Sequence, residues 1–207
     1  MSDTHRAAAW IKDDPFGVEF AELTIGKERM TATGVAVGIV PLSYRLDYEL
    51  ETAKGFVTTR LHVTSRGERW RRELDLRRHA DGKWSAAAKQ EGDVDLPTAG
   101  DDATGLVDVL DCDIGLSPVT NMMPILRHGL LHGGGPIEFT MAWIAVPALT
   151  IHADRQRYRH LSTDTGRHVV RYESIDGSFA ANIILDAHAV VIDFPGIARR
   201  LSEDSSC

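Results

Sequence analysis

The chain has 207 residues, 43% of them hydrophobic and 26% charged, and its formal net charge is −7. This composition is sufficient for one filled hydrophobic core, so we expect a single domain over residues 1–207 with polar tails at about 1–9 and 202–207. The negative charge argues against nucleic acid as a partner, because polyanion binding normally requires a basic surface.

The sequence contains no clear secretory signal or membrane span, and its two cysteines do not suggest a disulfide. The first nine residues lack the apolar run of a secretory signal, and no segment approaches the roughly 18 consecutive apolar residues of a membrane span. Cys112 lies between two aspartates and Cys207 ends a polar tail, which favours two free thiols. We therefore expect a cytoplasmic protein without a membrane span.

The first half of the chain is dominated by alternation of period two, which predicts β-strands. Residues 20–30 are an exception, because their mixed periodicity is a helical signal, interrupted by Gly26. Four predicted strands then follow one another at 44–50, 57–64, 70–76 and 83–87. Asp81-Gly82 suits a tight turn between the last two, so we expect a four-strand meander.

An exposed loop is predicted at 89–104, followed by a short helix that Ser117-Pro118 opens and Pro124 limits to a turn or two. The later predicted strands are 137–146, 155–161, 169–174, 179–185 and 189–194. Pro147 cannot donate a ladder hydrogen bond, so the strand before it should end, bulge or lie at an edge. The strands together predict a mainly β fold, built from a strongly curved antiparallel sheet, half-barrel or barrel-like, with a few short helices.

Two segments are too idiosyncratic for generic strands. Residues 110–127 read LDCDIGLSPVTNMMPILR, and residues 190–200 read VVIDFPGIARR. They resemble the two most recognisable blocks of the bacterial family called putative glycolipid-binding, with a weaker likeness at 56–60 and 81–84. The resemblance implies a curved antiparallel sheet with short helices against its concave side, similar to bacterial lipoprotein carriers and lipid-binding lipoproteins.

The resemblance favours a non-catalytic protein that holds a lipid or glycolipid-like amphiphile in an apolar pocket of the curved sheet. Arg127, with Asp111 or Asp113, would lie near the polar mouth, and inward aromatic and methionine side chains would line the pocket. We predict these ligand-binding residues: Asp111, Asp113, Asn121, Arg127, Phe139, Met141, Trp143 and Phe179.

Each prediction has a structural alternative. The apolar residues suit an ordinary core, and Asn121 suits a local turn cap. Arg127 suits a buried ion pair with Asp111 or Asp113, and the preceding residue, Leu126, stands where the family usually has a second arginine.

Two other functions stay open. One is an enzyme, a hydrolase or isomerase using Asp111, Asp113 and His128; the other is a scaffold without a small ligand, with an edge strand near Pro147. The acids and histidines of this region lack a firm metal-ligand spacing, and no P-loop, Rossmann or HExxH pattern occurs. We therefore assign no catalytic residue, metal or cofactor, and leave a homo-oligomer open.

Overall fold

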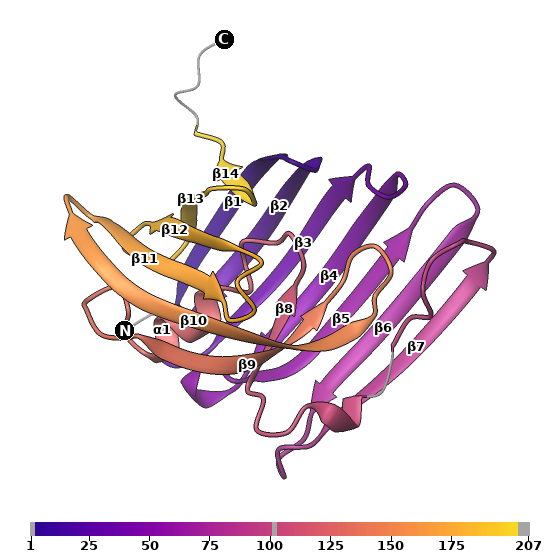
Figure 1. The fold of residues 1–207 in the computed structure, drawn as a ribbon, viewed down its shortest axis with the longest axis horizontal. Coiled ribbons are helices and arrows are strands. Elements are labelled where there is room, and N and C mark those ends of the chain that lie inside the picture. The colour runs from indigo at the N-terminus through magenta and orange to yellow at the C-terminus, as the bar shows by residue number, and fades with distance from the viewer. Residues whose placement is uncertain (1–2, 101–102, 203–207) are drawn as a thin grey trace.

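The computed structural model describes residues 3–100 and 103–202, which form one 14-stranded sheet (Figure 1). The first seven strands are β1 (Thr4–Asp13), β2 (Phe16–Ile25), β3 (Met30–Gly38), β4 (Tyr44–Thr52), β5 (Thr58–Arg66), β6 (Trp70–Arg78) and β7 (Trp84–Gly92). The others are β8 (Asp111–Ile114), β9 (Ile137–Ile144), β10 (Ile151–Asp164), β11 (Arg167–Ser174), β12 (Ala180–Leu185), β13 (Val191–Phe194) and β14 (Ala198–Arg200). The helical elements are η1 (Lys54–Phe56), η2 (Ala103–Gly105) and α1 (Met122–Arg127).

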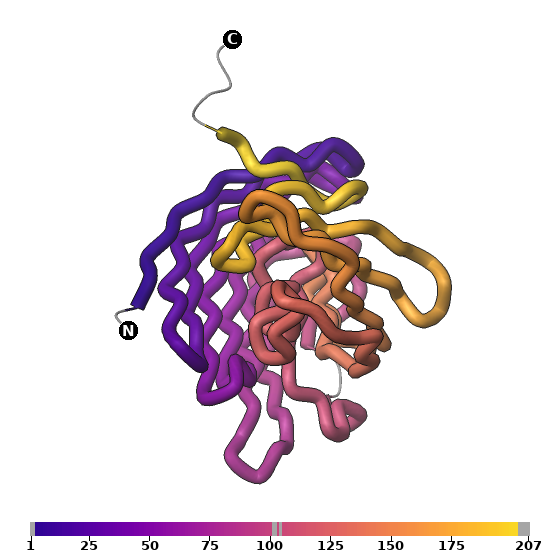
Figure 2. Tube along the Cα trace, turned by 90° about the vertical axis from the view of Figure 1, so that its left-hand side faces the viewer, coloured from indigo at the N-terminus to yellow at the C-terminus, as the bar shows by residue number. Residues whose placement is uncertain are grey.

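The strand order is β7-β6-β5-β4-β3-β2-β1-β14-β13-β12-β11-β10-β9-β8, so the sheet ends at β7 and β8 and does not close on itself. The sheet curls strongly, and its carboxy-terminal strands cross over the concave face of β1 to β7, with α1 between them (Figures 1 and 2). The hydrogen bonds that tie the halves together include one from Thr58 N to Leu110 O at 3.0 Å and one from Trp10 Nε1 to Val191 O at 2.9 Å. No helix among the described residues is long and apolar enough to cross a membrane.

The mainly β, strongly curved sheet is confirmed. Strands β4 to β7 form the predicted meander, and the predicted strands of the second half correspond to β9 to β13. Strand β9 ends at Ile144, before Pro147, as the missing ladder donor requires. Among the described strands the β8–β9 pair alone is parallel; every other neighbouring pair is antiparallel.

The helical signal at residues 20–30 was wrong, because this segment contains the end of β2, a turn and the start of β3. The predicted tail at 1–9 contributes Thr4–Ala9 to β1, and the predicted loop at 89–104 begins with the last residues of β7. Residues 203–207 of the other predicted tail lie outside the described residues. Ala21, Leu23 and Ile25 are buried and alternate with Glu22 and Thr24, and this period-two alternation is the strand pattern that the helical interpretation overlooked.

The concave side of the sheet is filled by packed side chains. The largest fully buried side chains include Trp10, Tyr158, Leu23, Met30, Leu46, Leu50, Leu61, Leu74, Leu76, Ile114 and Met122. Most belong to a core cluster that both halves of the sheet share, whereas Tyr158 belongs to a second cluster within the carboxy-terminal half. The sheet therefore covers its apolar face by curling over itself.

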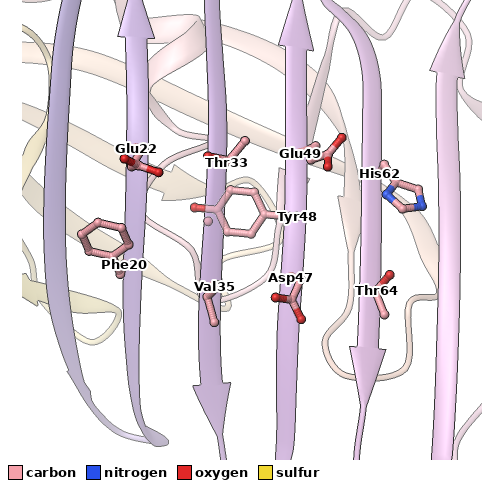
Figure 3. A pocket seen from close by; sticks show the side chains of 10 residues that line it. Phe20, Glu22, Thr33, Val35, Asp47, Tyr48, Glu49, His62 and Thr64 are labelled. Carbon is pink, nitrogen blue, oxygen red and sulfur yellow. The ribbon is translucent and has the colours of Figure 1, made fainter.

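Tyrosine rings from β4 lie across glycines of β3 on the concave side. A Cβ atom at Gly34 would overlap the Tyr48 ring, and one at Gly38 would overlap Tyr44. Figure 3 shows the Tyr48 ring crossing β3 at this point. The two glycines are thus required by close approach of the rings.

Gly34→Ala is expected to lower the free energy of unfolding by about 1–3 kcal/mol, because the added methyl group must displace a packed ring. Thr33→Ala, at the exposed neighbouring position, is the control, with an expected change within about 0.5 kcal/mol. Urea denaturation measures both. Equal effects for the two variants would contradict the packing argument.

Candidate functional site

The site begins at β8, an edge strand whose four residues are all buried. Its parallel register places Asp113 beside Trp143 of β9. Beyond the strand the chain turns sharply, with a hydrogen bond from Ser117 N to Ile114 O at 3.0 Å, and Leu116 adopts a positive φ of 64°. This turn leads into α1, so the first family-like block forms one strand, one turn and one short helix.

Asp113 is the centre of a buried hydrogen-bond network. Its carboxylate accepts from Thr120 Oγ1 at 2.6 Å and from Gln156 Nε2 at 2.8 Å. Tyr158 OH donates to Gln156 Oε1 at 2.9 Å and accepts from Asn121 Nδ2 at 2.8 Å. Burial raises the pKa of Asp113 to about 6, although the hydrogen bonds from Thr120 and Gln156 oppose that rise.

A cavity of about 60 Å³ opens beside this network, and we call it the Asp113 cavity. Buried polar side chains form its floor: Asp113, Ser117 and Asn121. The other side chains around it are Ile114, Leu116, Trp143, Tyr172, Phe179, Phe194 and Ile197, of which Leu116, Trp143, Phe179 and Ile197 are partly exposed and form the mouth. The cavity therefore combines a polar floor with aromatic and aliphatic walls.

Ser117 connects the cavity floor to a buried charge on the other half of the sheet. Its hydroxyl donates to Glu19 Oε1 at 2.6 Å. The Glu19 side chain is fully buried and also accepts from Tyr48 OH and from Lys12 Nζ, each at 2.8 Å. Burial of the Tyr44 hydroxyl raises its pKa to about 12, and the negative charge of Glu19 contributes to this rise.

Asp111 and Arg127 form a buried ion pair outside the cavity lining, which is the structural alternative that the sequence offered for Arg127. Arg127 Nη2 donates to Asp111 Oδ2, while Asp111 Oδ1 and two guanidinium nitrogens have no partner among the described residues. Burial raises the pKa of Asp111 to about 7, and the nearby Arg127 charge opposes this rise.

Four of the eight predicted ligand-binding residues therefore come together at the cavity: Asp113, Asn121, Trp143 and Phe179. The other four do not line it. Asp111 and Arg127 pair with each other, Met141 is fully buried, and Phe139 stacks on Tyr158 with ring centroids 5.2 Å apart.

Sequence reasoning assigned no ligand role to Ser117, Tyr172 or Ile197, which also line the cavity, or to Glu19 beneath it, whereas Phe194 was one of the aromatic side chains expected to face inward. Phe194 and Ile197 belong to the second family-like block, so that block was a usable signal. No sequence signal pointed to Glu19, because its contact with Ser117 joins positions 98 residues apart.

A second recess of about 340 Å³ lies on the outer face of β2 to β5, around the side chains in Figure 3. It contains none of the predicted site residues. Two of its polar side chains have ion-pair partners: Asp47 pairs with Arg45 at 2.5 Å, and His62 pairs with Glu73 at 3.1 Å. No group of three potential metal ligands occurs among the described residues, here or elsewhere. The Asp113 cavity is therefore the better candidate.

The fold and the site define a β protein in which one open, curved sheet holds a small polar-floored cavity lined by residues of its carboxy-terminal half. The chain belongs to the family described as putative glycolipid-binding, whose model matches residues 7–200. It is similar to the crystal structure of a DUF1089 family protein from Pseudomonas aeruginosa, with 30% sequence identity and a TM-score of 0.63, over 88% of this chain and 92% of that chain. A comparison with curated proteins finds no match. The family resemblance of the two sequence blocks is thus confirmed.

Asp113→Asn is expected to change how stability depends on pH. The folded-state pKa of about 6 lies above the ordinary 3.8, so the stabilisation from this group is complete below about pH 4 and is lost as the pH rises through about 6. Raising the pKa of Asp113 from 3.8 to about 6 corresponds to about 3 kcal/mol in the free energy of unfolding. The unfolding free energy of the wild type, minus that of the variant, should fall by roughly that amount between pH 4 and 7. Parallel urea-denaturation curves across this range would contradict the prediction.

Arg127→Met is expected to lower the free energy of unfolding by about 3–5 kcal/mol, because it leaves the buried Asp111 carboxyl group without its counter-charge. The double variant Asp111→Asn/Arg127→Met should lose less than the sum of the two single variants. A double-mutant cycle at pH 8 measures this coupling. Strict additivity would show that the pair contributes nothing as a unit.

Proposed function

We propose that this protein is a non-catalytic binding protein that holds the polar end of a lipid or glycolipid-like amphiphile in the Asp113 cavity. One observation carries the proposal: the two family-like blocks, 110–127 and 190–200, contribute to the same cavity. Asp113, Ser117 and Asn121 come from the first, and Phe194 and Ile197 come from the second. The two blocks are far apart in sequence, yet both carry the residue pattern of the family. Their meeting at one cavity is what a shared binding site would produce.

The size of the cavity determines which part of an amphiphile it suits. Pockets that enclose a drug-sized ligand have roughly 300 to 1,000 Å³. The 60 Å³ here is enough for about four water-sized groups. An acyl chain, which the sequence placed inside the curved sheet, would not fit this cavity. We therefore assign the polar end of the ligand to the cavity and place its apolar chain outside the mouth.

An enzyme built on Asp111, Asp113 and His128 is less well supported, because these side chains do not line one cavity together. Asp111 is engaged by Arg127, and the His128 ring stacks on Phe139 with centroids 6.1 Å apart, whereas only Asp113 lines the cavity. General acid–base catalysis needs its groups within reach of one reacting atom. The cytoplasmic location and a homo-oligomer stay predictions from the sequence.

Trp143→Ala tests the proposal. The purified protein is incubated with a total bacterial lipid extract, re-isolated, and compared by native and denaturing mass spectrometry. We expect a stoichiometric adduct in the wild type that is lost on denaturation, and at least about tenfold weaker binding in the variant, a loss of about 1.4 kcal/mol.

Phe20→Ala is the matched control, because Phe20 is a half-exposed aromatic residue on the opposite face of the sheet. It should retain the adduct. No adduct in the wild type, or equal losses in the two variants with unchanged thermal stability, would count against the binding function at this cavity.

A further inference from the structure

We infer that the Asp113 cavity selects an uncharged, hydroxyl-bearing group, such as one edge of a sugar ring, and rejects anionic headgroups. This inference rests on the proposed binding function and specifies its ligand class. It depends on three properties of the cavity: its charge, the direction of its hydrogen bonds, and its walls.

The charge of the lining disfavours an anion. The eleven residues around the cavity include one carboxylate, Asp113, and no lysine, arginine or histidine. A phosphate, sulfate or carboxylate headgroup would therefore lose its water next to a like charge, without a counter-charge in contact. Removing a charge from water costs far more than removing a hydroxyl group, and for an ammonium ion in so small a space the desolvation of both charges offsets the Coulombic gain of pairing with Asp113.

The nearby buried cationic side chains already form ion pairs with other carboxylates. Arg127 pairs with Asp111, and Lys12 pairs with Glu19 at 2.8 Å. Neither side chain lines the cavity. Recruiting either one for an anionic ligand would leave a buried carboxylate without its partner, at a cost of several kcal/mol.

The hydrogen-bond network leaves mostly acceptors among the polar side chains of the lining. The Ser117 proton is donated to Glu19 and Val119 N donates to the hydroxyl oxygen at 3.3 Å, so this oxygen keeps one lone pair to offer and no proton. Asn121 donates one amide proton to Tyr158, which leaves its carbonyl oxygen and its second amide proton for other partners. The Asp113 carboxylate accepts two bonds and retains further lone pairs. Such a floor receives hydrogen bonds from hydroxyl groups.

Glu19 is consequently a positioning residue for this specificity, although it lies outside the cavity on β2. Its three donors, Lys12, Tyr48 and Ser117, hold the carboxylate in place, and the carboxylate fixes the direction of the Ser117 O–H bond. The walls complete the match, because Trp143, Phe179 and Phe194 present apolar ring surfaces suited to the C–H face of a sugar.

The test compares three probes with one tail: octyl β-glucoside, octyl sulfate and octylamine, each below its micelle concentration. Isothermal titration calorimetry is expected to give a Kd for the glucoside at least about tenfold lower than for either charged probe. Ser117→Ala should weaken glucoside binding and bring the ratio of the Kd values for sulfate and glucoside toward one. Glu19→Gln should change the same ratio, which a purely structural effect on stability would not.

Ser65→Ala is the matched control, because Ser65 is also a fully buried serine but lies on β5, away from the cavity lining. It should leave the ratio unchanged. Equal or tighter binding of octyl sulfate or octylamine overturns the ligand class. If that happens while the lipid-extract adduct persists, the proposed function survives and this inference alone fails. If neither the glucoside nor the extract binds, both fail.

Discussion

The buried carboxylate of Glu19 joins three separate parts of the sheet through hydrogen bonds. An ionised group without contact to water must be matched by donors, and here the donors come from β1, β4 and the turn after β8. Satisfying this one group therefore fixes the turn against the amino-terminal half of the sheet. Gly34 is part of the same arrangement, because the Tyr48 ring must cross β3 to reach Glu19.

The same constraint accounts for the character of the cavity. A close-packed core leaves little empty space, and the cavity persists where two polar networks meet, one around Glu19 and one around Asp113. Ser117 belongs to the first and Asn121 to the second. Because each network is internally satisfied, the polar atoms at the cavity floor have defined directions instead of rotating freely. Such preorganisation favours selective binding in a small volume.

The sequence predicted the sheet and the segments of the site better than the contacts within the site. Alternation identified β4 to β7 and β9 to β13, where large apolar side chains face inward. In β2 the pattern follows the usual rule over residues 21–25 but is reversed just before them: Val18 and Phe20 are 43% and 48% exposed, while Glu19 between them is buried. A carboxylate on the inner face between two apolar residues on the outer face contradicts the usual rule, so the role of Glu19 could not be inferred. Asp113 and Asn121 were predictable because the resemblance located them.

The parallel pairing of β8 explains how distant segments reach one cavity. Since β8 runs alongside β9, the chain leaves β8 at the end where β9 also stops, and Gly115 N donates to Ile144 O at 2.9 Å. The following turn therefore lies beside the β13–β14 turn, where Ser117 can donate its hydrogen bond to Glu19. An antiparallel β8 would release the chain at the opposite end of the edge, near Ile137, and Ser117 could not contact Glu19. The β8–β9 pair, which alone among the described strands departs from the antiparallel arrangement, is thus the feature that assembles the site.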